Sequence, residues 1–296
     1  MPDSTETIHP RFDDLIIPGA RLRHLADGCV WAEGPVWMPD SSSLVWSDIP
    51  NNRMLTWSEG AGSSTFREPS GYTNGNTLDR EGRLVSCQHS PGLITRTEPD
   101  GTVITLADNY RGNKLNSPND LVVKSDGSIW FTDPPYGILS DHEGHQRESE
   151  IGANYVFRLD PDSGDLTVVG DDFDRPNGIA FAPDEVTIYI ADTGKPRNLR
   201  VLTVNDDNTL TNIREFAAPD PPASDGFRVD AKGNVWTSAG DGVHVFAPDG
   251  TLLGKISVPE EAANCEFGGP DGRTLFITAT TSLYSIDVAV TRAPRP

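Results

Sequence analysis

One pattern that recurs six times constrains the fold of this chain more than any other feature. Each copy begins with a polar or acidic residue, continues as a short apolar strand, reaches a turn seven residues later and resumes as a second apolar strand. The leading residues are Glu33, Asn74, Asn119, Asn177, Asp225 and Asn264. The turn residues are Asp40, Glu81, Asp126, Asp184, Lys232 and Asp271. Successive leading residues lie 39 to 58 positions apart, and propeller blades repeat every ~40–50 residues.

Turn signals between the copies supply further strands. Asp100-Gly101, Ser163-Gly164 and Asp249-Gly250 each separate two short apolar runs, which predicts a hairpin at each place. Four antiparallel strands per repeat, arranged around one axis, form a propeller blade. The sequence therefore predicts an all-β fold, a six-bladed β-propeller with little helix. An open β-solenoid would need shorter repeats, and two β-sandwiches would not repeat one motif in register.

The chain is interpreted as one domain with an N-terminal addition. Its 296 residues are many for an average domain, but a ring spreads them over small sheets. We expect residues 1–30 to form a segment that closes onto the propeller, and residues 31–296 to form a single propeller domain. The polar residues 137–154 predict a long loop over one face.

Charge and cysteine content narrow the partners and the location. The net charge of −20 would repel nucleic acid and acidic membrane surfaces. Cys29, Cys87 and Cys265 are widely spaced, so neither a disulfide framework nor a thiolate zinc site is predicted. No basic and apolar export signal opens the sequence, and no apolar run approaches the ~18 residues of a membrane span. We expect a cytoplasmic protein that binds neither nucleic acid nor membranes, and the oligomeric state is open.

The six leading residues converge at the mouth of the channel in a propeller, because each begins the innermost strand of its blade. All six carry a side-chain oxygen, and burying them together is costly without a cation. Oxygen donors without His or Cys select Ca²⁺, Mg²⁺ or Mn²⁺, and Ca²⁺ is favoured because it tolerates a mixed shell. Alternatively, Asn74-Gly75, Asn177-Gly178 and Asp225-Gly226 are turn residues that cap strands. The common register of all six copies favours a shared site.

Five motifs in order resemble the SMP-30/gluconolactonase/LRE family over about residues 30–290. They are WAEGPVW (31–37), LNSPNDLVV (115–123), IWFTDPPYG (129–137), RPNGIAFAPD (175–184) and SDGFRVDAKGNVW (224–236). The resemblance implies a six-bladed lactonase whose divalent cation is held by Glu33, Asn119, Asn177 and Asp225. The stretches NGNTLDREGRLVSCQH and TDPPYG are closer to the bacterial gluconolactonases. Where the regucalcin-like branch has an Arg two residues before the N-D asparagine, this chain has Ser117.

Ring and resemblance together predict a metal-dependent hydrolase that opens a small sugar lactone. Its cation would polarise the lactone carbonyl. Asp225 is the first candidate for activating the attacking water, and His89, expected to titrate near neutrality, is the second. The residues predicted to contact the lactone are Asn74, Asn119, Asn264 and Tyr136.

Several alternatives stay open on the sequence. A phosphotriesterase-like hydrolase could use the same ring, and a non-enzymatic calcium-binding scaffold could have the same fold. His89 has a purely structural interpretation. Asp133 and Asp192 follow second strands, where carboxylates accept backbone N–H groups, and this is their default role. Asp133 could instead organise a second, structural cation.

Overall fold

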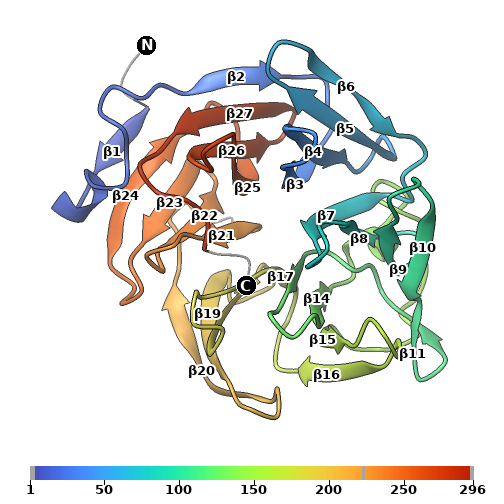
Figure 1. Cartoon of the computed structure of the whole chain (residues 1–296). Helices are drawn as coiled ribbons and strands as arrows, with labels where there is room; N and C mark the ends of the chain where they lie inside the picture. The colour runs from blue at the N-terminus through green and yellow to red at the C-terminus, as the bar shows by residue number, and fades with distance from the viewer. Residues whose placement is uncertain (1–3, 222–223, 294–296) are drawn as a thin grey trace.

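The computed structural model describes residues 4–221 and 224–293, and Figure 1 shows their strands arranged as a ring of sheets around one axis. Each sheet is antiparallel, and its strands follow one another outward from the axis. Within the described residues, helix is limited to η1 (Pro10–Phe12), a 3-10 turn, and α1 (Tyr136–Leu139). The predicted six-bladed β-propeller, poor in helix, is confirmed.

The first three blades are numbered in chain order from their innermost strands. Blade 1 contains β3 (Ala32–Met38), β4 (Ser43–Asp48), β5 (Arg53–Ser58) and β6 (Gly62–Arg67). Blade 2 contains β7 (Thr73–Leu78), β8 (Leu84–Gln88), β9 (Leu93–Thr97) and β10 (Val103–Ala107). A ribbon of β11 (Asn109–Tyr110) and β12 (Asn113–Lys114) follows. Blade 3 contains β13 (Leu121–Val123), β14 (Ile129–Asp133), β15 (Tyr155–Leu159) and β16 (Leu166–Gly170).

Blades 4 to 6 follow in chain order, and N-terminal strands complete blades 5 and 6. Blade 4 contains β17 (Pro176–Phe181), β18 (Thr187–Asp192), β19 (Asn198–Val204) and β20 (Leu210–Ala217). Blade 5 contains β21 (Phe227–Val229), β22 (Val235–Ala239), β23 (Gly242–Phe246) and β24 (Leu252–Ser257), with β1 (Thr5–Thr7) at its outer edge. Blade 6 contains β25 (Ala262–Gly268), β26 (Thr274–Ala279) and β27 (Ser282–Asp287), with β2 (Arg23–Ala26) outermost.

Strands from the two ends of the chain therefore share a sheet. β2 pairs with β27, and β1 pairs with β24 of the neighbouring blade. The division of the chain into residues 1–30 and 31–296 stays a prediction, and residues 1–3 and 294–296 of those ranges lie outside the described residues.

The predicted turns lie where the repeat places them. All six turn residues separate the first strand of a blade from the second. The carboxylate of Asp184 accepts hydrogen bonds from the backbone N–H groups of Val186 and Thr187, both at 2.9 Å. Asp126 accepts in the same way from Ser128 at 2.9 Å. These aspartates favour the turn because their side chains replace a backbone acceptor.

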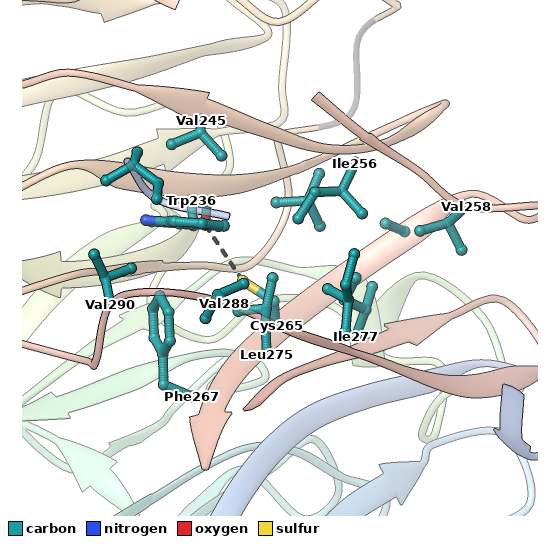
Figure 2. Packing of buried hydrophobic residues seen from close by; sticks show 14 of the residues in the cluster. Trp236, Val245, Ile256, Val258, Cys265, Phe267, Leu275, Ile277, Val288 and Val290 are labelled. Carbon is teal, nitrogen blue, oxygen red and sulfur yellow. Dashed lines mark hydrogen bonds between the residues drawn. The ribbon is translucent and has the colours of Figure 1, made fainter. Parts of the chain in front are cut away.

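Apolar side chains fill the spaces between neighbouring blades. Figure 2 shows Trp236 and Val245 of blade 5 facing Cys265 and Ile277 of blade 6. Phe12 of the N-terminal segment is buried in the same cluster. Alternation along each strand sends one set of side chains to each flanking blade, so every blade packs on both faces.

The innermost strands approach one another closely at glycines. A β-carbon at Gly34 would lie 2.0 Å from the carbonyl oxygen of Asn74, and one at Gly178 would lie 2.3 Å from that of Asp225. Gly75 and Gly178 lie inside β7 and β17, so the interpretation of their dipeptides as turns is wrong. Glycine is needed here because the backbone of the next blade occupies the space of a side chain.

Residues 137–154 form the predicted loop, except that the first of them belong to α1 (Tyr136–Leu139). Arg147 donates hydrogen bonds to the carbonyl oxygens of Leu115 and Asn116. His145 contacts the ring of Tyr72 edge-on, with 5.4 Å between ring centroids. The loop therefore lies against the segments that precede the inner strands of blades 2 and 3.

Two further expectations can be compared with the structure. The three cysteines are free and buried, as expected for a chain without a disulfide framework. Across residues 4–221 and 224–293, no helix has the length and apolar character needed to cross a bilayer.

We predict that Gly178→Ala destabilises the protein by ~3 kcal/mol or more, because the added methyl meets backbone that cannot rotate away. Gly82→Ala is the control, since no atom lies within 4 Å of its β-carbon position. Its positive φ should limit the cost to about 1–2 kcal/mol. Urea unfolding measures both values, and equal losses would contradict the packing role of Gly178.

Candidate active site on the propeller axis

The structure brings all six leading positions together around the axis. The glycine after a leading residue donates its N–H group to the next blade in three places: Gly75 to Asn119 O at 2.8 Å, Gly178 to Asp225 O at 3.1 Å, and Gly226 to Ala263 O at 2.8 Å. Two second-strand hydroxyls act likewise, Ser47 donating to Asn74 O and Thr132 to Asn177 O, both at 2.7 Å. Blade 6 contacts blade 1 through a side-chain hydrogen bond from Asn264 to Glu33, so each blade is joined to the next around the axis.

Glu33 and Asn264 form a buried pair. Oε2 of Glu33 accepts from Gly34 N at 2.6 Å and from Asn264 Nδ2 at 3.0 Å. Oδ1 of Asn264 accepts from Cys265 N at 2.8 Å. Burial raises the pKa of Glu33 to about 7 against the opposing effect of these N–H donors. Asn264 thus offers an N–H group to the ring, whereas Oε1 of Glu33 has no described donor.

Asn177 and Tyr136 meet at Thr193, which follows β18. Nδ2 of Asn177 lies 3.4 Å from Thr193 Oγ1, and the hydroxyl of Tyr136 lies 2.5 Å from the same oxygen. The guanidinium of Arg175 lies over the Tyr136 ring at 5.6 Å. Tyr136 is therefore held beside the ring of leading residues, and its contact with a substrate stays a prediction.

His89 lies next to Asn74. Its Nε2 is 3.2 Å from Asn74 Nδ2, and its Nδ1 is 3.1 Å from the carbonyl oxygen of Glu143 in the 137–154 loop. Burial lowers the pKa of His89 to about 4. The expectation that His89 titrates near neutrality is wrong for this structure, because the imidazolium would lose its hydration in a buried position.

Asp225 and Asn119 complete the ring. Burial and the nearby Glu33 raise the pKa of Asp225 well above its ordinary value, with Glu143 the next contributor. Within the described chain, no N–H or O–H group donates to the carboxylate of Asp225, and the side chain of Asn119 has no hydrogen-bond partner. The backbone N–H of Asn119 donates to Thr132 O at 2.9 Å.

The oxygens without donors provide a test of whether a cation fits. They belong to Glu33, Asn177 and Asp225, and the side-chain oxygens of Asn74 and Asn119 likewise have no described donor. The two carboxylates repel each other, so a hard divalent cation that accepts carboxylate and amide oxygens fits this set. No three His, Cys, Asp or Glu side chains among residues 4–221 and 224–293 could hold a metal by themselves. Amide oxygens would have to complete the shell.

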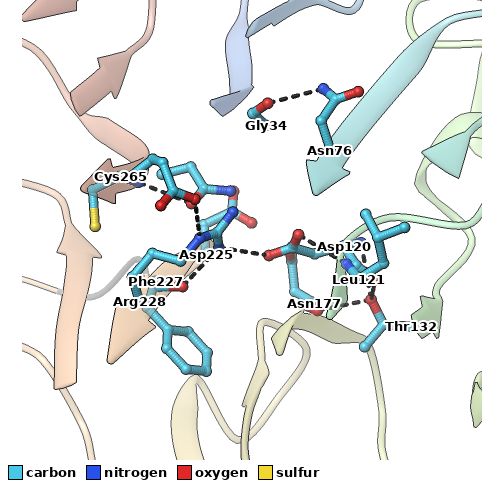
Figure 3. A network of polar contacts seen from close by, with 12 residues as sticks. Gly34, Asn76, Asp120, Leu121, Thr132, Asn177, Asp225, Phe227, Arg228 and Cys265 are labelled. Atoms are coloured by element: carbon cyan, nitrogen blue, oxygen red, sulfur yellow. Dashed lines mark hydrogen bonds and ion pairs between the residues drawn. The ribbon is translucent and has the colours of Figure 1, made fainter. Parts of the chain in front are cut away.

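A buried chain of ion pairs lies beside the ring, and sequence reasoning missed it (Figure 3). Nε of Arg228 lies 2.9 Å from Glu266 Oε2, and its Nη1 lies 3.5 Å from Asp120 Oδ2. Nη1 of Arg292, near the C-terminus, lies 2.9 Å from the same Glu266 oxygen. Side-chain exposure is 4% for Arg228, 2% for Asp120 and 0% for Glu266. The sequence signal for these ion pairs was the presence of Asp120, Arg228 and Glu266 one to three positions after a leading residue.

Asp133 and Asp192 have the default role expected of them. The two carboxylate oxygens of Asp133 accept from the backbone N–H groups of Asn116 and Ser117, both at 2.9 Å. Asp192 accepts from Arg175 N at 2.9 Å. The Ser117 hydroxyl donates to Pro134 O at 2.6 Å and so holds the turn before α1. A second, structural cation near Asp133 stays a prediction.

Known proteins with similar sequences and structures are lactonases and their relatives. A family model described as the SMP-30/Gluconolactonase/LRE-like region matches residues 31–281. A gluconolactonase of Zymomonas mobilis is 33% identical over 302 residues, covering 94% of this chain and 84% of the relative. A solved gluconolactonase from Xanthomonas campestris is 39% identical, with a TM-score of 0.92 and coverage of 97% and 95%. A calcium-binding regucalcin from Agrobacterium tumefaciens shares the fold, with a TM-score of 0.75 at 20% identity and coverage of 93% and 96%.

We predict that Arg228→Met lowers the free energy of unfolding by about 3–5 kcal/mol, because it removes the guanidinium that pairs with the buried carboxylate of Asp120 and leaves Glu266 with one fewer positive partner. Arg23→Met is the matched control, since the Arg23–Asp287 pair is about half exposed, at 46% and 49%. Its loss should stay below ~1 kcal/mol. Chemical denaturation of both variants checks the difference, and an Arg228 loss as small as the control's would argue against a structural role for the chain.

Proposed function

Because the chain belongs to the SMP-30/gluconolactonase/LRE-like family, we propose that it is a lactone hydrolase that opens a small sugar lactone. The observation that carries the proposal is the set of donor-free oxygens of Glu33, Asn177 and Asp225 on the propeller axis. Gluconolactonases that align with almost the whole chain support the class of substrate. The small-molecule lactone is the proposed partner, and a cytoplasmic location stays a prediction.

The same residues would hold one divalent cation. Glu33, Asn119, Asn177 and Asp225 supply only oxygen, which favours Ca²⁺, with Mg²⁺ and Mn²⁺ as the alternatives. The regucalcin of similar fold is described as a calcium-binding protein. When bound, the cation would polarise the lactone carbonyl and offset negative charge that develops on its oxygen.

Asp225 is the residue proposed to activate water. Its carboxylate has no described donor, so it is free to accept a proton from a water that attacks the lactone carbonyl carbon. The new C–O bond forms as that proton passes to Asp225. The ring C–O bond then breaks, and the proton returns to the ring oxygen, which becomes the hydroxyl of the hydroxy acid.

The remaining site residues are proposed to orient the lactone. Oδ1 of Asn74 has no described donor and can accept a hydrogen bond from a sugar hydroxyl. Tyr136 and Asn119 lie beside the candidate cation ligands and can contact the same molecule. Asn264 already donates to Glu33 and accepts from Cys265, so its contribution to binding would be to hold Glu33.

We expect the purified protein to hydrolyse glucono-1,5-lactone, to lose this activity on exhaustive chelation and to regain it with Ca²⁺. Release of acid from the lactone, followed with a pH indicator, measures the rate. A parallel panel of other aldonolactones, homoserine lactones and phosphotriesters in defined metal ranks the alternatives. Hydrolysis of phosphotriesters alone, or of no compound in the panel, would overturn the proposal.

Asp225→Asn should lower kcat by about 10²-fold or more at saturating Ca²⁺, as expected for loss of a general base. The substitution keeps the size of the side chain and one oxygen donor. His89→Ala, measured under the same conditions, should keep most of its kcat. If the order of the two effects is reversed, the proton passes through His89 rather than Asp225.

A further inference from the structure

One assignment of the Thr193 hydroxyl proton satisfies all of its neighbours. Oγ1 lies 3.2 Å from the carbonyl oxygen of Arg175, which can only accept, and we assign the single hydroxyl proton to this bond, because the Tyr136 hydroxyl can then donate its own proton to Oγ1. Two lone pairs remain, and two groups face them: the hydroxyl of Tyr136 at 2.5 Å and Nδ2 of Asn177 at 3.4 Å. Thr193 is therefore an acceptor towards Asn177.

This assignment decides which way the Asn177 amide lies. With Oδ1 against Thr193, two acceptor oxygens would face each other with no proton between them. With Nδ2 there, the amide donates to Thr193 and Oδ1 is directed elsewhere. Asn177 is 4% exposed, and within the described residues its Oδ1 receives no hydrogen bond. This oxygen is not one of the fully buried atoms that lack a partner, so it keeps accessible surface through which a ligand can reach it.

His89 acts on Asn74 by the same logic. Nδ1 of His89 faces the carbonyl oxygen of Glu143 at 3.1 Å, so in the neutral ring Nδ1 carries the proton. Nε2 then has a lone pair, which accepts from Asn74 Nδ2 at 3.2 Å. Oδ1 of Asn74, itself 4% exposed, is the end of the amide without a described partner.

Asn264 shows that this orientation is not a general property of the ring. Its Nδ2 points to Glu33 and its Oδ1 is used by Cys265 N, so no oxygen is left over. The ring therefore contains one amide with a partner at both ends and two amides whose oxygen has no described donor.

We propose that Thr193 and His89 are positioning residues, which hold the NH₂ groups of Asn177 and Asn74 so that both asparagines present their carbonyl oxygens to the ligand. In each case the single proton of the positioning side chain, on Thr193 Oγ1 or His89 Nδ1, is donated to a backbone carbonyl. The lone pair that remains, on Thr193 Oγ1 or His89 Nε2, can accept a hydrogen bond only from the NH₂ group of the asparagine. The proposal rests on the proposed function for the identity of the ligands, a cation at Asn177 and a lactone hydroxyl at Asn74.

Thr193→Val tests the first residue, because it keeps the branched shape and removes the hydroxyl. Binding of Tb³⁺, a luminescent substitute for Ca²⁺, should weaken by about 3- to 10-fold, the value of one hydrogen bond. Thr193→Ser should bind within twofold of the wild type. Thr187→Val is the control, because Thr187 lies at the other end of β18 and its hydroxyl bonds only to Asp184 in a turn.

NMR tests the second residue without any ligand. Long-range ¹H–¹⁵N spectra of the wild-type protein at neutral pH should show His89 protonated at Nδ1 and unprotonated at Nε2. In kinetics, His89→Ala and Asn74→Ala should each raise KM for the lactone, and the double variant should raise it no further than either single change.

The outcomes separate this inference from the proposed function. A wild-type protein that binds no Tb³⁺ and opens no lactone would overturn the proposed function, and the NMR result would still decide the orientation of Asn74. Equal Tb³⁺ affinity in Thr193→Val and the wild type would overturn the role of Thr193. An Nε2-protonated His89, or additive effects of His89→Ala and Asn74→Ala, would overturn that of His89.

Discussion

The close approach of neighbouring inner strands at the axis is the constraint on which the rest of the structure depends. Backbone N–H groups of Gly75 and Gly178 reach the carbonyl oxygens of the next blade. A side chain at either glycine would push those blades apart. Because the approach is made by backbone, the side chains of the leading residues are not used for it and can converge on the axis. One set of contacts thus closes the ring and creates the site.

The buried charged groups near the axis form one set that is balanced by ion pairs and one set that is not. Arg228 and Arg292 lie against Asp120 and Glu266, two positive and two negative groups that neutralise one another. Among residues 4–221 and 224–293, no cationic side chain forms an ion pair with Glu33 or Asp225, and each is disfavoured as an anion by burial. A dication would neutralise these two carboxylates without disturbing the ion pairs beside them. The position of the uncompensated charge therefore marks where a cation would bind.

The neighbours of each ring residue divide an apparently uniform set into different roles. Asn264 supports Glu33, whereas Asn177 and Asn74 each keep an oxygen available. A neighbour takes the NH₂ group of each of the three amides, and the difference lies at the oxygen, because only Oδ1 of Asn264 accepts a described donor, the backbone N–H of Cys265. His89 is accordingly better suited to orienting a side chain than to transferring a proton.

Much of this arrangement follows from the sequence, since a repeated register of polar leading residue, turn and apolar strand specifies blades and sends Glu33 and Asp225 to a common axis. Composition and spacing also exclude a disulfide framework. Tertiary structure decided the rest. The sequence left Asn74-Gly75 and Asn177-Gly178 open between strand-capping turns and a shared site, and it did not predict the close approach at these glycines, because the atoms that exclude a side chain belong to another blade. The ion partners of Arg228 and the orientation of each amide likewise depend on groups tens to more than a hundred residues away, which a local pattern does not contain.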